Sequence, residues 1–232
     1  MPSTMPSAKR SPSSPFEDPW SLSEIEQRSA DLVAPVRNLL TALCRQPAQH
    51  ARFLNTLSMM EHIGSRKIMT SQAKGPLGCE VLKHLCEEAR HAFFFKRQAE
   101  KIAGRPLDYS AETTIAAGPA QMYFGRLDAA IGRSLAGSQH SDAPYLFVSL
   151  IIELRAIWAY EIYHQVLNAE APAVSLKSLL AEEEHHLPQM VERLTQLGED
   201  LKGRVPAFAA TEDRLFRGLW RAVEAAVPPT VH

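Results

Sequence analysis

Apolar residues recur every three or four positions along most of this chain, which is the spacing of an α-helix with one buried face. No segment shows the strict alternation of apolar and polar residues that is typical of a half-buried strand. A first helix is expected over 21–46, where Ser21 and Glu24 have capping-box spacing and Pro35 should kink or split the helix. Further helices are expected over 49–73, 79–103, 120–135, 142–168 and 175–201, and a last one from Thr211. The pattern therefore predicts an all-α protein.

The connections between these helices indicate how they are arranged. Helices 49–73 and 79–103 are joined by a short link, and so are helices 142–168 and 175–201. The segment 104–142 between the two pairs is a long crossover. Two short-linked pairs joined by a crossover are typical of one class of four-helix bundle.

The length and composition agree with one large helical domain. The chain has 232 residues, of which 45% are hydrophobic, and this is enough for a sizeable core. We expect residues 21–232 to form a single domain, with a four-helix core at about 49–201. Residues 1–20 are rich in Ser and Pro, which predicts a disordered tail.

Charge and cysteine usage narrow the classes of function. A net charge of -1 argues against general nucleic-acid binding and against a role on a membrane surface. The apolar run LFVSLII is too short to cross a membrane, and Glu153 and Arg155 follow it. The three cysteines are odd in number and lack Cys-x-x-Cys spacing, which predicts reduced thiols in a cytoplasmic protein.

Two segments carry a glutamate followed three positions later by a histidine, and an isolated glutamate lies on the helix before each of them. On an α-helix, residues three apart share a face, so both members of a pair point in the same direction. Each pair also shares its face with apolar residues, which predicts that it is buried. The six candidate residues are Glu61, Glu88 and His91, then Glu153, Glu183 and His186.

The helix expected over 175–201 offers two overlapping Glu-x-x-His pairs. Glu182 and His185 have the same spacing as Glu183 and His186. At about 100° per residue, His185 faces away from the leucine stripe of this helix, whereas His186 lies within it. The phase therefore favours Glu183 with His186.

The helix expected over 142–168 leaves a second alternative open. Glu161 forms another Glu-x-x-His pair with His164, whereas Glu153 stands alone. The distance along the chain to the following motif is similar in both hairpins if Glu153 is used, which favours Glu153. Glu161 and His164 remain candidates to support a ligand or to replace one, and Tyr160 is expected to pack in the core.

Four carboxylates and two neutral imidazoles are the kind of ligand set that two iron ions require. Four buried carboxylates without a cation would be very unfavourable, whereas their charges offset the four positive charges of two ferrous ions. The same ligands also suit manganese or a mixed pair. The motifs therefore predict a di-metal centre inside the helical core.

In the order of these motifs, the chain resembles the ferritin-like di-iron carboxylate superfamily over about 49–201. The resemblance implies a ferritin-like four-helix bundle with a long crossover, here with extra helices at both ends. It also implies a non-haem di-iron oxygenase or oxidase that activates dioxygen to oxidise a small organic substrate, with electrons from an external donor. One metal would then be served by Glu61, Glu88 and His91, and the other by Glu153, Glu183 and His186.

Other functions fit parts of the pattern. A ferroxidase or peroxide scavenger would use the same ligands without an organic substrate, and a metal-free helical scaffold would pair its acids in another way. His84, Glu88 and His91 form His-x-x-x-Glu-x-x-His, similar to N-oxygenases of the p-aminobenzoate type, where the extra histidine lies on the last ligand helix. His84 is therefore open as an added ligand or as a hydrogen-bond partner of one. Apolar faces on the terminal helices favour a homodimer.

Overall fold

The computed structural model describes residues 22–71 and 78–227, and within these ranges every regular element is a helix, which confirms the all-α prediction. The predicted tail at 1–20 lies outside the described residues. The helices are α1 (Leu22–Arg28), the short 3-10 helix η1 (Ala30–Leu32), α2 (Val33–Cys44), α3 (Pro47–Ser71), α4 (Cys79–Ala103), α5 (Ala117–Ser134), α6 (Ala143–Glu170), α7 (Lys177–Gln196) and α8 (Leu201–Ala226).

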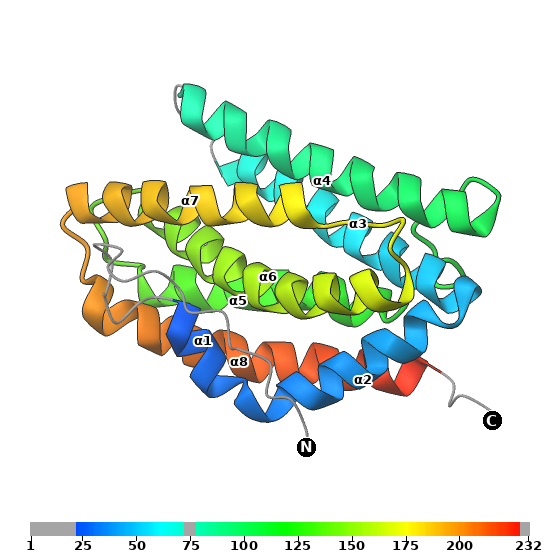
Figure 1. Cartoon of the computed structure of the whole chain (residues 1–232). Coiled ribbons are helices and arrows are strands. Elements are labelled where there is room, and N and C mark those ends of the chain that lie inside the picture. Colours follow the sequence, from blue (N-terminus) through cyan, green and yellow to red (C-terminus); the bar gives the residue numbers. More distant parts are fainter. Residues whose placement is uncertain (1–21, 72–77, 228–232) are drawn as a thin grey trace, which may run out of the picture.

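The helices are arranged around α6. In Figure 1, α4 and α7 lie along one side of the molecule and α1, α2 and α8 along the opposite side, with α5 and α6 between them. α3 packs along α4, and α6 along α7, so both predicted helix pairs are present. α6 also contacts α1, α2, α5 and α8, which explains why it is apolar nearly all round. None of the described helices combines the length and the apolar character that crossing a membrane requires.

The first predicted helix is broken before Pro35, and not at it. α1 ends at Arg28, and α2 begins at Val33 after a short 3-10 turn. Pro35 lies in the first turn of α2, where its missing N–H has no helical partner to lose. The break follows at Ser29, which is fully buried and whose hydroxyl accepts a hydrogen bond from Arg155 at 2.8 Å. The first helix therefore breaks at a residue that is held by Arg155, which lies far away in the sequence.

The C-terminal helices also differ from the prediction. α7 ends at Gln196, earlier than expected, because Gly198 adopts a left-handed φ of 71° that terminates the helix. α8 begins at Leu201, well before the expected start at Thr211. Asp200 caps it through its carboxylate, which accepts a hydrogen bond from the backbone of the first turn. The predicted cap Thr211 lies inside α8.

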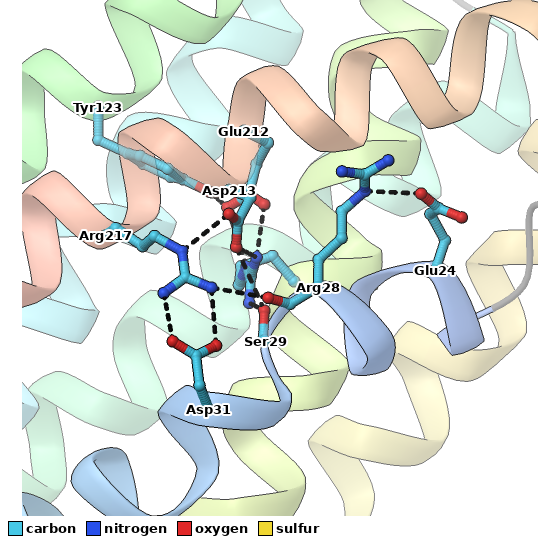
Figure 2. A network of polar contacts seen from close by, with 9 residues as sticks. Glu24, Arg28, Ser29, Asp31, Tyr123, Glu212, Asp213 and Arg217 are labelled. Atoms are coloured by element: carbon cyan, nitrogen blue, oxygen red, sulfur yellow. Dashed lines mark hydrogen bonds and ion pairs between the residues drawn. The ribbon is translucent and has the colours of Figure 1, made fainter.

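A buried ion pair joins the N-terminal helices to α6 and α8. Arg155 donates hydrogen bonds to both carboxylate oxygens of Glu212, at 2.9 and 2.8 Å. Glu212 is fully buried and also accepts a hydrogen bond from the Tyr123 hydroxyl at 2.7 Å. Figure 2 shows Tyr123 of α5, Glu212 of α8 and Ser29 of the turn after α1 converging on this network. The pair therefore connects segments that are far apart in the chain.

Replacing Glu212 with alanine should destabilise the protein by about 3–5 kcal/mol, because the buried charge of Arg155 would keep only its longer ion pair with Asp213, at 3.6 Å. Chemical denaturation measures this change in the free energy of unfolding. The pair between Glu24 and Arg28, at 2.6 Å and partly exposed, provides the control (Figure 2). Glu24→Ala should cost no more than about 1 kcal/mol. Equal losses in the two variants would contradict the role given to the buried pair.

A second buried polar cluster lies where α2, α3 and α6 meet. His50 is 2% exposed, and its Nε2 lies 2.6 Å from the Tyr163 hydroxyl and 3.7 Å from Cys44 Sγ. Burial lowers the pKa of His50 to about 4. It also raises the pKa of Cys44 to about 12 and that of Tyr163 well above its usual range. All three groups are therefore neutral near pH 7.

Acidification should weaken the fold through His50. Between pH 6.5 and about 4, the unfolded chain binds a proton on this imidazole that the folded protein excludes, so the free energy of unfolding falls as the pH falls. His50→Gln should remove this component and flatten the pH dependence by up to about 1.4 kcal/mol per pH unit. Denaturation curves at several pH values measure the difference. Parallel pH dependences in the two proteins would show that His50 is not held neutral.

Candidate metal centre

Four helices bring the predicted acids together inside the protein. α4 supplies Glu88, α6 supplies Glu153 and α7 supplies Glu183, which are 9%, 3% and 2% exposed. Glu61 on α3 is half-buried beside them. Within the described ranges, three overlapping groups have possible ligand atoms within 4.8 Å of one another. They are Glu61, Glu88 and His91; then His84, Glu153 and His186; and finally Glu88, Glu153 and Glu183.

All six predicted residues thus belong to one cluster with two ends. One end combines side chains of α3 and α4, and the other combines the acid of α6 with His186 of α7 and His84 of α4. The third group, which consists of three glutamates, lies between the ends because Glu88 and Glu153 each belong to one of them. This arrangement can hold two cations and share carboxylates between them.

His91 is oriented as a metal ligand would be. Its Nδ1 lies 3.0 Å from Glu183 Oε1, yet this buried nitrogen makes no hydrogen bond, because the atoms are not aligned for one. Its Nε2 lies 2.8 Å from Glu182 Oε2. A buried ring nitrogen without a hydrogen bond is unfavourable, and a cation beside the carboxylates would satisfy it. The residues present therefore fit a bound metal ion.

His186 has a similar arrangement on the other helix, although its Nδ1 does make a hydrogen bond, with Glu153. Its Nδ1 faces the cluster and lies 3.3 Å from Glu153 Oε2 and 3.7 Å from Glu183 Oε2. Its Nε2 lies 2.7 Å from Glu87 Oε2. Each histidine thus has one nitrogen among the central acids and the other held by an outer carboxylate.

The sequence did not predict the role of the outer carboxylates: Glu87 was not a candidate, and Glu182 was considered only as an alternative ligand paired with His185. Glu87 of α4 holds His186 of α7, and Glu182 of α7 holds His91 of α4, so the two contacts cross between the helices. A signal was present, because both motifs read Glu-Glu-x-x-His. One residue is about 100° of helix rotation, which turns the first glutamate away from its own site and toward the neighbouring helix.

Positive side chains at the rim accompany these outer acids. Arg90 pairs with Glu182, and Lys83 Nζ lies 3.9 Å from Glu87 Oε1. Both cations are largely exposed, so water screens these pairs. The central glutamates have no lysine or arginine within ion-pair distance in the part of the chain that the structure describes.

His84 joins the end of the cluster that contains Glu153. Its Nε2 lies 3.0 Å from Glu153 Oε1 and 3.4 Å from Glu88 Oε1. Its Nδ1 lies 2.9 Å from the hydroxyl of Tyr145, and its ring centre is 4.6 Å from that of His186. These contacts suit an added ligand as well as a hydrogen-bond donor to two ligands, so both interpretations of His84 stay open.

The alternative residues of α6 lie differently. Glu153 belongs to two of the three groups, whereas Glu161 and His164 belong to none of those found in the described ranges. His164 Nε2 lies 3.3 Å from the side-chain nitrogen of Asn168 in the next turn. Tyr160 was expected to pack in the core; it is buried, and its hydroxyl donates a hydrogen bond to Glu61.

Charge within the cluster is balanced by protons when no cation is bound. Burial lowers the pKa of all three histidines, but their carboxylate partners outweigh it. The pKa rises to about 10 for His91 through Glu183, to about 10 for His186 through Glu153, and to about 12 for His84. Burial, together with repulsion from Glu88, raises the pKa of Glu61 well above its usual range. Bound cations would take over the role of these protons.

Space for ions and small molecules is kept open beside the acids. A cavity of about 80 Å³ is lined by the central carboxylates together with His84, Tyr145 and apolar side chains of α5 and α6. Gly64, one turn after Glu61 on α3, also lines it. A Cβ at this position would lie 3.0 Å from Glu88 Oε2, so the glycine leaves room for that carboxylate.

Comparison with known proteins identifies no relative. No family model, no curated protein and no solved structure matches this chain. The chemistry of the cluster is therefore argued from the residues themselves.

Gly64→Ala should weaken the binding of ferrous iron by on the order of tenfold, because the new methyl group would crowd Glu88 and disturb its orientation. Gly125→Ala on α5 is the matched control, since nothing lies within 4 Å of a Cβ placed there. It should gain helix propensity and leave metal binding unchanged. Isothermal titration calorimetry under anaerobic conditions measures the affinity of each variant for ferrous iron. Equal affinities in the two variants would contradict the tight fit at Gly64.

Proposed function

We propose that this protein is a non-haem di-iron oxidoreductase that activates dioxygen to oxidise a small organic substrate. One observation carries the proposal. Two histidines, His91 and His186, turn Nδ1 toward buried carboxylates while Glu182 and Glu87 hold their Nε2 atoms. Carboxylates that hold the outer nitrogen of a histidine are a common support for histidines that bind metals.

The central acids support a bound metal over a metal-free scaffold. A metal-free scaffold would have only the protonated histidines to balance four acids, since the two arginines nearest in sequence are engaged elsewhere. Arg155 pairs with Glu212, and Arg90 pairs with the outer acid Glu182. Two divalent cations would supply the missing positive charge. Mixed oxygen and nitrogen ligands suit iron, and they also suit manganese.

The helix order supports a ferritin-like bundle as the framework of this site. α3 with α4 and α6 with α7 form two packed pairs, and each pair contributes one isolated glutamate and one Glu-x-x-His motif. The additional helices α1, α2 and α8 cover the far side of α6. Such a cover favours an enclosed oxidation site, which a protein that only stores iron does not need.

Each part of the cluster has a definite task in this proposal. When bound, two irons would supply the redox chemistry that activates dioxygen, with reducing electrons from an external donor. Glu182 and Glu87 would accept hydrogen bonds from the Nε2–H groups of His91 and His186, so that each Nδ1 is left without a proton and can bind a cation. Tyr160 donates to Glu61 and orients that carboxylate. The residues that would hold the irons are Glu61, Glu88 and His91 for one and Glu153, Glu183 and His186 for the other, with His84 beside Glu153.

Adjacent residues of α7 give a direct test. Glu183→Gln should reduce the iron content from about two ions per chain to one or none, because it removes a central charge. Glu184→Gln, at the exposed next position, should keep both ions. Elemental analysis after anaerobic reconstitution with ferrous iron measures the content. The proposal is wrong if Glu183→Gln retains two irons or if the unaltered protein binds none.

A further inference from the structure

A second cavity extends from the candidate metal centre toward α2 and α8. It has a volume of about 110 Å³ and lies among side chains of α2, α3, α5, α6 and α8. Glu61 and Tyr160 line it at the metal centre, and Phe216 and Trp220 line it from α8. We call this space the apolar cavity. It shares Glu61, Phe124, Ile152 and Ala156 with the smaller cavity beside the central acids, so the two spaces adjoin.

The polar groups that line the apolar cavity are engaged with the protein. The Arg155 guanidinium donates to Glu212 and to Ser29. The hydroxyl of Thr56 accepts the N–H of Ile115 at 2.7 Å. Trp220 Nε1 donates to Glu224 at 3.0 Å.

The tyrosines are engaged in the same way. Tyr123 donates to Glu212, Tyr160 donates to Glu61, and the Tyr163 hydroxyl lies 2.6 Å from His50 Nε2. A charged or strongly polar guest would lose its hydration in this cavity, where the one acid among the described lining residues, Glu61, is already bonded to Tyr160 and belongs to the metal centre. An apolar guest has no strongly hydrated group, so it would not bear this cost.

The size of the cavity limits the guest further. A protein cavity of roughly 150 Å³ lined by apolar side chains stays dry and binds benzene or xenon. The apolar cavity, at about 110 Å³, is of the same order. Small side chains keep it open, since Ala156 and Ala159 of α6 line it among much larger neighbours. It therefore suits a single ring or a short hydrocarbon chain.

We propose that the apolar cavity binds a small, uncharged, apolar molecule, an aromatic ring or a short alkyl chain, with one end beside Glu61 and Tyr160. The role of this molecule as the substrate rests on the proposed di-iron function, whereas its binding does not. The cavity thus assigns a substrate class to the site.

Three compounds that each contain one benzene ring provide the test: toluene is neutral, benzoate is an anion and benzylamine is a cation. Toluene should raise the melting temperature of the full-length protein in a concentration-dependent manner, with or without iron, because it binds only the folded state. Benzoate should produce no comparable shift, because its charge would find no free partner in the cavity. Benzylamine should also produce none, because Glu61, the only acid among the described residues there, is engaged with Tyr160. Equal binding of benzoate, or no binding of toluene, would overturn the proposal.

Variants at two alanines locate the binding. Ala159→Leu should fill the cavity and weaken toluene binding by on the order of tenfold or more. Ala129→Leu, the same change at an exposed position of α5, should leave it unchanged. Ala159→Val is the milder change if the leucine is not tolerated. Toluene binding that survives both changes at Ala159 would place the guest elsewhere and overturn the proposal.

Iron content measured on the same samples separates the two proposals. If toluene binds but no iron does, the apolar cavity stands and the di-iron function fails. If two irons bind and toluene does not, the function stands and the assignment of the substrate class fails.

Discussion

The removal of four carboxylates from water into one shared space is the constraint on which the rest of the structure depends. Burial disfavours their charged forms, and the repulsion between neighbours adds to that cost, as the raised pKa values of Glu61 and Glu183 show. The acids are placed on four long helices, whose backbones are more rigid than loops and keep the carboxylates close together. Histidines stand between them, and a second set of acids holds the histidines from outside. The members of the cluster stabilise one another, because each offsets a charge or orients a partner of another.

The central helix α6 carries two buried polar centres on different faces. Glu153 and Arg155 are two residues apart, which on a helix means about 200° of rotation. Glu153 faces the candidate metal centre, and Arg155 faces Glu212 and Ser29 on the side of the terminal helices. The apolar cavity lies between them, lined by Glu61 near one centre and by Arg155 near the other. The terminal helices are therefore part of the architecture of the site. Side chains of α2 and α8 line the apolar cavity on the side opposite the metal centre.

Helical phase made the core of the cluster predictable, while contacts between helices did not follow from it. The apolar stripe of α7 distinguished His186 from His185, and the structure buries the former and exposes the latter. The supporting role of Glu87 and Glu182 was not predicted, because each holds a histidine of the neighbouring helix, and the pattern of one helix alone does not show its neighbour. The break at Ser29 has a similar origin, since its partner Arg155 lies far along the chain. The start of α8 was missed for a local reason, because Asp200 offered a cap ahead of the equally plausible Thr211.

The crossed contacts between α4 and α7 have a consequence for how the two hairpins recognise each other. Glu87 reaches His186 while Glu182 reaches His91, so both contacts form only at one longitudinal alignment of the helices. A slip of one turn, about 5.4 Å, would separate both pairs at once and leave both imidazoles without the acids that hold their Nε2 atoms. Leucine stripes alone tolerate such slips, because one apolar side chain replaces another. The two crossed contacts thus favour a single longitudinal alignment of α4 and α7, and they do so without a bound cation.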